Sequence, residues 1–329
     1  MARYAAIAGT GSYVPETVLT NFDLEKMVDT TDEWIRKRTG IVERRISDDD
    51  MATSDLAVRA ARQAIKTAEV DPLDVDMIIV GTVTPDTLFP ATGCYVQQGI
   101  GAKNASAFDL SAACAGFIYG LDVADGMIKS GRYDTILVIG GEVFSNILDW
   151  TDRSTCVLFG DGAGAAVLRG TDEPKGIIAS YIGSDGDNAD IDLLGIPAGG
   201  SRLPPSHETI DKKLHSIKMS GREVFKLGVR IMPESAQRVL EQSGLTIDDI
   251  DLLIPHQANL RIIEAVGERL GIPREKVYVN VDRYGNTSAA TVIIALDEAI
   301  REGRAKQGDN ILLVTFGAGL TWGSTLLKL

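Results

Sequence analysis

The chain has 329 residues, of which 44% are apolar, so it is long enough for a large core and longer than a single domain usually is. With 33 lysines and arginines against 46 aspartates and glutamates, its net charge of -13 argues against a protein that binds nucleic acid or a membrane surface. The three cysteines are few and odd in number, which predicts reduced thiols in a soluble, cytoplasmic protein. We identify no signal peptide and no transmembrane segment.

Short β-branched runs alternate with amphipathic helical stretches along the chain, which is typical of an α/β fold. Predicted strands include "DMIIVG" (76–81), "TILVIGG" (135–141) and "NILLVTFG" (310–317). The glycine-rich "FGDGAGA" (159–165) lacks the strand-then-helix context of a nucleotide-binding loop, so we interpret it as a tight strand turn.

The second half of the chain repeats the pattern of the first. "DVDMIIVG" (74–81) matches "DIDLLIPH" (249–256), and "CAGFIYGLDVA" (114–124) falls on "AATVIIALDEA" (289–299) at the same offset of 175 positions. Two βα units can match by chance because both obey one hydrophobic pattern. The alternative is duplication into two similar halves, 1–174 and 175–329, that pack about a pseudo-twofold axis.

Duplication would bring three loops together at the carboxyl ends of strands, where α/β folds place their active sites. These loops carry Cys114, His256 and Asn286. Each has an ordinary structural explanation, as a small buried apolar group, a hydrogen-bonded strand-end histidine and a helix N-cap. Taken together they predict acyl transfer by an activated cysteine, with the amide orienting the histidine or donating to an oxyanion.

Cys114 is predicted to open a helix whose buried stripe contains Phe117, Ile118, Leu121 and Ile128. A thiol at a helix N-terminus can have its pKa lowered from about 8.5. We therefore expect a reactive thiol there. Cys94 and Cys156 are expected to be buried apolar residues, and His207 and His215 to be solvated surface groups.

The motifs "SAACAGF", "PHQAN", "GNTSAA" and "FGAGLTWGS" resemble the β-ketoacyl-acyl-carrier-protein synthase III family of the thiolase superfamily. The resemblance implies an α/β protein with a duplicated thiolase-like fold, layered α-β-α-β-α, which acts as a homodimer. It implies condensation of a short acyl-CoA, such as acetyl-CoA, with malonyl-acyl-carrier protein, without a metal or a resident cofactor. Two alternatives are a relative that condenses or transfers acyl groups in secondary metabolism and a non-catalytic binding protein, in which a residue of the Cys-His-Asn set would be replaced.

Carried over by motif, the resemblance makes Cys114 the residue that takes the acyl group, with His256 and Asn286 holding the malonyl thioester carbonyl and its enolate. The backbone amides of Cys114 and Ala318 would form the oxyanion hole. The expected coenzyme A contacts are Trp34, Arg38, Thr39, Arg153 and Asn259, where Trp34 and Arg153 flank the adenine. The expected acyl pocket contains Phe144 together with Phe89, which would reach across the dimer.

Because carrier protein is acidic in this family, its docking requires a basic surface. Arg222, Lys226 and Arg230 recur every four positions and so are predicted to line one helix face. Arg261 and Arg269 would extend this surface, with Gln257 beside His256. An ordinary solvated helix face is the alternative.

Overall fold

The structure is a computed structural model and describes residues 3–329. Two large sheets form its centre, one with strand order β1-β7-β6-β4-β5 and the other with order β11-β12-β13-β8. The first sheet consists of β1 (Tyr4–Tyr13), β7 (Gly162–Thr171), β6 (Thr135–Glu142), β4 (Met77–Gly81) and β5 (Ser106–Leu110). The second consists of β11 (Leu252–Pro255), β12 (Asn310–Gly317), β13 (Thr321–Lys328) and β8 (Gly176–Ser184).

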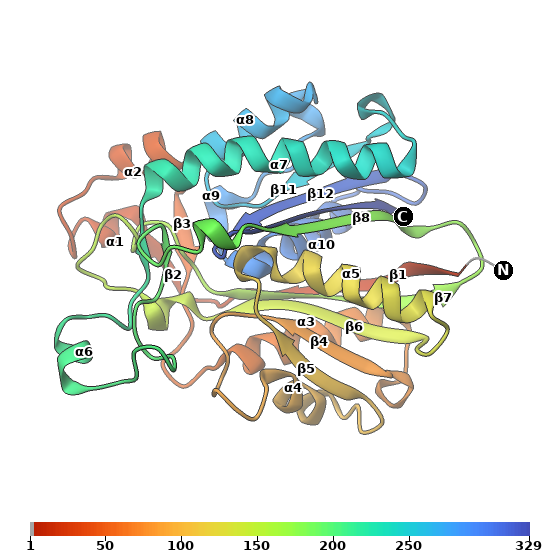
Figure 1. The fold of residues 1–329 in the computed structure, drawn as a ribbon, viewed down its shortest axis with the longest axis horizontal. Helices are drawn as coiled ribbons and strands as arrows, with labels where there is room; N and C mark the ends of the chain where they lie inside the picture. Colours follow the sequence, from red (N-terminus) through yellow and green to blue (C-terminus); the bar gives the residue numbers. More distant parts are fainter. Residues whose placement is uncertain (1–2) are drawn as a thin grey trace.

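Helices cover both outer faces and fill the space between the sheets (Figure 1). The main helices are α3 (Thr53–Ala68), α4 (Thr92–Ile100), α5 (Gly116–Lys129), α7 (Gly221–Ser243), α8 (Leu260–Leu270) and α10 (Thr291–Arg301). Both α5 and α10 contact strands of both sheets, whereas α3 and α4 cover the first sheet and α7 and α8 the second. The α-β-α-β-α layering expected from the resemblance is therefore confirmed.

The duplication is present in the tertiary structure as well as in the sequence. The strands β4 and β11 begin at Met77 and Leu252, and the central helices α5 and α10 begin at Gly116 and Thr291, so each pair is offset by 175 positions. The sheet orders also correspond, except that the second sheet has no strand equivalent to β5 within the described residues. The first sheet ends at residue 171 and the second begins at 176, and the division at 174 remains our prediction.

The burial of these elements explains their sequence patterns. Every residue of β4 and β11 is buried, because these strands pair in parallel and helices cover both of their faces. The predicted stripe of α5 is buried, with Phe117, Ile118 and Leu121 at 0% exposure. Gly120 and Ala124 are buried as well, since α5 lies between two sheets and not on the surface of one.

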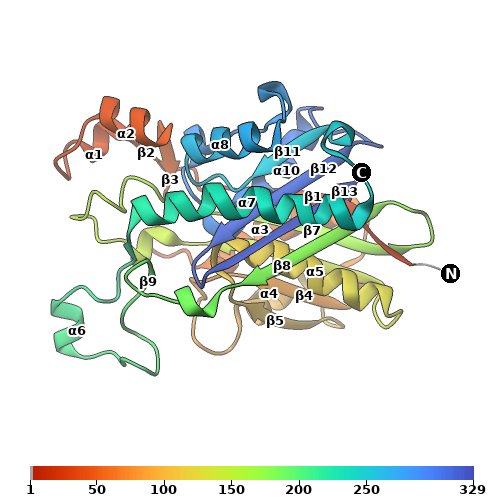
Figure 2. The same ribbon diagram turned by 45° about the horizontal axis from the view of Figure 1, so that its top comes forward.

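Shorter elements surround one end of this core (Figure 2). They are α1 (Asn21–Leu24), α2 (Asp32–Thr39), α6 (His207–Asp211), α9 (Val281–Tyr284), and the two-stranded pairs β2 (Val18–Thr20) with β3 (Glu43–Arg45) and β9 (Leu194–Gly195) with β10 (Lys218–Met219). Among residues 3–329, no helix has both the length and the apolar character required to cross a membrane.

Candidate active site

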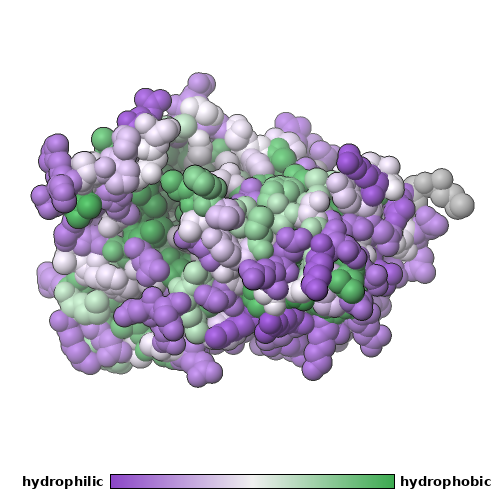
Figure 3. All heavy atoms as spheres, turned by 90° about the horizontal axis from the view of Figure 1, so that it is seen from below, coloured by the Kyte–Doolittle hydropathy of each residue, from purple (hydrophilic) through white to green (hydrophobic). Residues whose placement is uncertain are grey.

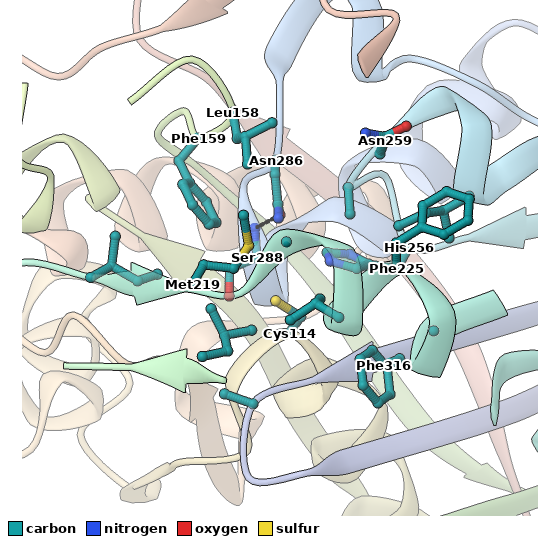
Figure 4. A pocket seen from close by; sticks show the side chains of 18 of the residues that line it. Cys114, Leu158, Phe159, Met219, Phe225, His256, Asn259, Asn286, Ser288 and Phe316 are labelled. Carbon is teal, nitrogen blue, oxygen red and sulfur yellow. Dashed lines mark hydrogen bonds between the residues drawn. The ribbon is translucent and has the colours of Figure 1, made fainter. Parts of the chain in front are cut away.

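A cavity of about 800 Å³ lies between the two halves and receives all three loops singled out in the sequence. Cys114, His256 and Asn286 line it, and their side chains converge on one space (Figure 4). Cys114 comes from the short 3-10 turn Ala113–Ala115 before α5, His256 follows β11, and Asn286 precedes the equivalent turn Ser288–Ala290 before α10. The pseudo-twofold arrangement thus brings the three residues together from both halves.

The environment of Cys114 differs from the expectation of a lowered pKa. The residue is only 6% exposed, and burial raises the pKa of its thiol to about 12. Burial between the sheets thus shifts the pKa of the Cys114 thiol upwards, which is the opposite direction from the lowering expected at a helix N-terminus. Cys156 is buried as expected, but Cys94 is exposed, which corrects the expectation of a buried apolar residue there.

His256 is held in place by two hydrogen bonds. Its backbone N–H donates to the Val314 carbonyl on β12 at 2.8 Å, and its ring Nδ1 lies 2.7 Å from Thr291 Oγ1 on α10. The side chain is 4% exposed, and burial lowers the pKa of the imidazole to about 3, so the ring is neutral at neutral pH. The other ring nitrogen, Nε2, is left to meet a ligand in the cavity.

Asn286 is oriented by the turn that follows it. Its Oδ1 accepts a hydrogen bond from the Ser288 backbone N–H at 2.8 Å, and its own N–H donates to the Leu158 carbonyl. With Oδ1 occupied in this way, the amide Nδ2 is the group that can donate into the cavity. Ala113 and Ser288, at equivalent positions of the two halves, both have positive φ (45° and 50°), a strained conformation often found at functional sites.

The predicted oxyanion turn lies directly beside the cysteine. Ala318 lines the cavity, and Thr321 Oγ1 is within hydrogen-bond distance of the Ala318 carbonyl at 2.9 Å and the Ala112 carbonyl at 2.8 Å. Thr321 therefore connects the turn after β12 to the residues just before Cys114. This connection places the backbone amides of both segments at the same end of the cavity.

Three of the five expected coenzyme A residues line the cavity, whereas Trp34 and Arg153 do not. Arg38, Thr39 and Asn259 line the cavity, and Asn259 Nδ2 donates to the Arg38 carbonyl at 3.1 Å while its Oδ1 caps α8. The guanidinium carbon of Arg153 lies only 5.3 Å from the centre of the Trp34 ring. An adenine cannot fit between these groups, so Arg153 would have to move for the expected stack to form.

The two phenylalanines of the expected acyl pocket have different surroundings. Phe144 is 3% exposed, lines the cavity and stacks on Phe159 with ring centres 4.6 Å apart. Phe89 is 85% exposed and lies outside the cavity of its own chain, so the two phenylalanines do not line one pocket within a single chain.

The expected docking residues separate into two groups. Arg222, Lys226 and Arg261 line the cavity mouth, where α7 and α8 lie side by side (Figure 2). The other three residues do not line the cavity. Arg230 is exposed, and Arg269 donates a hydrogen bond to the Val229 carbonyl. Gln257 is only 1% exposed. The prediction that Gln257 contacts the carrier protein is therefore wrong, because its side-chain amide is buried.

The amide of Gln257 belongs to a buried network that the sequence did not indicate. It donates to the carbonyls of Pro255 and Tyr278, and it accepts from the Asn280 backbone N–H at 2.9 Å. The Asn280 side chain donates to Glu298 on α10 at 2.7 Å, and Glu298 also accepts from Arg283 and Tyr284. Glu298 thus joins the loop of His256 to the loop of Asn286.

A buried cysteine, histidine and asparagine between duplicated halves suit acyl transfer, and the layered fold around them is that of the thiolase-like enzymes which the sequence resembles. Residues 108–186 match the family described as 3-oxoacyl-[acyl-carrier-protein (ACP)] synthase III, and residues 240–329 match its C-terminal region. A β-ketoacyl-[acyl-carrier-protein] synthase III of Caldanaerobacter subterraneus is 59% identical over 98% of this chain and 97% of its own.

Solved structures agree with the sequence comparison. The crystal structure of 3-oxoacyl-[acyl-carrier-protein] synthase III from Aquifex aeolicus is 49% identical, with a TM-score of 0.91 over 99% of this chain and 100% of its own. The priming β-ketosynthase of the R1128 polyketide pathway is 37% identical, with a TM-score of 0.91 over 100% of this chain and 97% of its own. The chain belongs to the β-ketoacyl-acyl-carrier-protein synthase III family.

Proposed function

We propose that this protein catalyses the decarboxylating condensation of a short acyl-CoA with malonyl-acyl-carrier protein, giving 3-oxoacyl-acyl-carrier protein and initiating fatty-acid synthesis. The observation that carries the proposal is the convergence of Cys114, His256 and Asn286 on one cavity in a chain of this family. A nucleophile lies beside two side chains that can donate to a carbonyl oxygen. This arrangement suits both acyl transfer to the cysteine and stabilisation of an enolate.

In the first half-reaction, Cys114 Sγ attacks the thioester carbonyl of the acyl-CoA. The tetrahedral intermediate then expels coenzyme A thiolate, which takes up the proton that the cysteine loses. Because burial keeps Cys114 as a neutral thiol at neutral pH, that proton leaves as the sulfur attacks. The oxyanion is met by the backbone amides of Cys114 and Ala318, which cost no reorganisation at the moment of reaction.

In the second half-reaction, the malonyl thioester carbonyl lies against His256 and Asn286. Loss of carbon dioxide leaves an enolate, whose oxygen accepts hydrogen bonds from the His256 Nε2–H and the Asn286 Nδ2–H. The enolate carbon attacks the acyl carbonyl on Cys114, and the Cys114 thiolate leaves and is reprotonated. This chemistry requires no metal, and within residues 3–329 no three His, Cys, Asp or Glu side chains form a group that could bind one.

We assign coenzyme A to the mouth formed by α2 and α8, where Arg38 and Asn259 face the cavity. Trp34 would stack on the adenine after Arg153 moves away from its ring. The acidic carrier protein would meet Arg222, Lys226 and Arg261 at the same mouth. Of these cations, Lys226 is already paired with Glu223 at 2.8 Å.

We also propose that the protein acts as a homodimer in the cytoplasm. The loop between β4 and α4 exposes Leu88 at 86% and Phe89 at 85%, the largest exposures among the large apolar side chains of residues 3–329. Apolar groups also gather in a hollow on the underside of the molecule (Figure 3). Sedimentation equilibrium should give the mass of a dimer for the wild type and a lower mass for Phe89→Ser. The same mass for both proteins would oppose a role for Phe89 in the dimer. The cytoplasmic setting rests on the cysteine content alone.

The test follows each half-reaction by itself. Wild-type protein mixed with acetyl-CoA should gain one acetyl group by intact mass, and with malonyl-acyl-carrier protein it should then release carbon dioxide and form acetoacetyl-carrier protein. Cys114→Ser should take up no acetyl group, whereas Asn286→Ala should be acetylated yet lose most of its decarboxylation. Acetylation of the wild type with no condensation on malonyl-carrier protein would instead favour a related acyl transferase of secondary metabolism, such as the polyketide priming enzyme.

A further inference from the structure

The hydroxyl of Thr291 lies directly behind the catalytic imidazole. Thr291 is the first residue of α10 and is 2% exposed, and its Oγ1 is 2.7 Å from His256 Nδ1. The same oxygen is 2.9 Å from the Ser288 carbonyl. A hydroxyl carries one proton, so it can donate to only one of these two acceptors at a time.

The direction of this donation determines which nitrogen of the ring carries its proton. If Thr291 donates to the Ser288 carbonyl, Nδ1 must carry the proton and donate to Thr291 Oγ1, and Nε2 faces the cavity as an acceptor. If Thr291 donates to Nδ1, the proton is on Nε2, and His256 faces the cavity as a donor. Because the ring is neutral, only one of these two forms exists at a time.

The Ser288 carbonyl does not require the Thr291 hydroxyl. It already accepts a hydrogen bond from the backbone N–H of Thr291, so one donor satisfies it without the side chain. Nδ1 is buried and is hydrogen-bonded to the Thr291 hydroxyl, so an Nδ1 without a proton has this hydroxyl as its donor. This assignment satisfies both acceptors.

We propose that Thr291 is a positioning residue that donates its hydroxyl to His256 Nδ1 and so holds the neutral ring in the Nε2–H tautomer. Nε2–H and Asn286 Nδ2–H are then two donors aimed at one carbonyl oxygen. With the opposite tautomer, a lone pair of Nε2 would face that oxygen and repel it. The inference rests on the function proposed above for the enolate step, but the tautomer can be measured on the resting protein.

The experiment reads the tautomer directly by nitrogen-15 NMR of histidine-labelled protein. A His207→Gln/His215→Gln background leaves His256 as the only histidine of the three. We expect a protonated Nε2 and an unprotonated, hydrogen-bonded Nδ1. In Thr291→Val the Nδ1 resonance should move to the position of a nitrogen without a donor, and Thr291→Ser should return it. A protonated Nδ1 in the wild type, or an unchanged His256 spectrum in Thr291→Val, would overturn the proposal.

Rate measurements distinguish a role of Thr291 in positioning His256 from a role in the stability of the fold. Thr291→Val should lower decarboxylation of malonyl-carrier protein by at least about 10-fold, because wrongly oriented imidazoles catalyse poorly, and should change acetylation of Cys114 by less than about 3-fold. The matched control is Thr325→Val, since Thr325 is fully buried on β13 and bonds Ser180 at 3.2 Å, away from the cavity.

The control should be destabilised with neither half-reaction selectively lost and with its His256 signals unmoved. Equal loss of both half-reactions in Thr291→Val would show a merely structural role. A wild type with protonated Nε2 that releases no carbon dioxide would refute the proposed function and leave the tautomer assignment intact.

Discussion

Gly317 on β12 lies so close to Cys114 that a β-carbon at position 317 would be 2.7 Å from the Cys114 backbone nitrogen. That nitrogen carries one of the two proposed oxyanion donors. The absence of a side chain at 317 is therefore what allows the strand of the second half to approach the cysteine of the first.

Gly317→Ala should displace the Cys114 backbone and lower the rate of acetylation by about 100-fold, because removing one oxyanion donor typically costs that much. Intact-mass kinetics with acetyl-CoA measure the rate. Gly126→Ala is the matched control, because position 126 on α5 has open space around it and alanine favours a helix interior, which should stabilise the protein by up to about 1 kcal/mol. A Gly317→Ala enzyme that is acetylated at the wild-type rate would show that β12 can shift to accommodate the methyl group without disturbing the Cys114 backbone amide.

Alkylation should reflect exposure and not the helix terminus. At pH 7 iodoacetamide should label the exposed Cys94 before Cys114, since Cys114 is buried and its pKa is raised to about 12. In a Cys94→Ala variant, the labelling rate of Cys114 should rise about 10-fold for each pH unit from 7 to 9, because the thiolate fraction grows in that proportion below the pKa. Peptide mass spectrometry gives the rates. A plateau below pH 8 would show that the cavity stabilises the thiolate after all.

Glu298 should matter to the second half-reaction more than does its neighbour Asp297, which is also buried. Glu298→Ala removes the acceptor shared by Asn280, Arg283 and Tyr284, which should shift the loops of His256 and Asn286 and lower decarboxylation by about 10- to 100-fold. Acetylation of Cys114 should change little. Carbon dioxide release and intact mass measure the two steps separately.

Asp297→Ala is the control for Glu298. Asp297 is the preceding residue on α10 and is 2% exposed, but it accepts from Thr10 and Ser12 on β1 instead of from the active-site loops. Its loss should destabilise the protein without separating the half-reactions. If both variants selectively lose decarboxylation, Glu298 has no specific role in holding the two loops. Glu298→Gln provides a milder test if the alanine variant does not fold.

Phe144→Ala should widen the preference for the primer. Its ring stacks on Phe159 in the cavity wall, so its removal leaves room for a longer acyl chain. The ratio of kcat/KM for hexanoyl-CoA to that for acetyl-CoA should rise at least about 10-fold, since one methylene in an apolar pocket is worth about that factor. Leu148→Ala, in the same apolar cluster but outside the cavity lining, should leave the ratio unchanged. An unchanged ratio in Phe144→Ala would place the acyl chain elsewhere.

Charge reversal at the cavity mouth should affect the carrier protein alone. Arg222→Glu or Arg261→Glu should raise KM for malonyl-carrier protein, most strongly at low salt, while acetylation by acetyl-CoA stays within about 2-fold. Arg238→Glu, on the far part of α7 where Arg238 faces Glu241, controls for overall charge. If all three reversals act alike, carrier protein docks elsewhere.

The duplicated fold and the meeting of Cys114, His256 and Asn286 could be predicted from the amino-acid sequence. Apolar periodicity is a local property, and its repetition at an offset of 175 positions is visible in the letters. Once two halves share a pattern, equivalent strand ends must meet near their common axis, so the convergence follows from topology alone.

The chemical behaviour of those groups depends on contacts that the sequence does not indicate. The raised pKa of Cys114 depends on the sheets that pack over both sides of its helix, and this burial has no local signal in the sequence. Gln257 and Thr291 acquire their roles from hydrogen-bond partners 23 and 35 residues away. A polar side chain has the same letter whether it faces water or a buried partner, and the contacts between distant segments decide which of the two it meets.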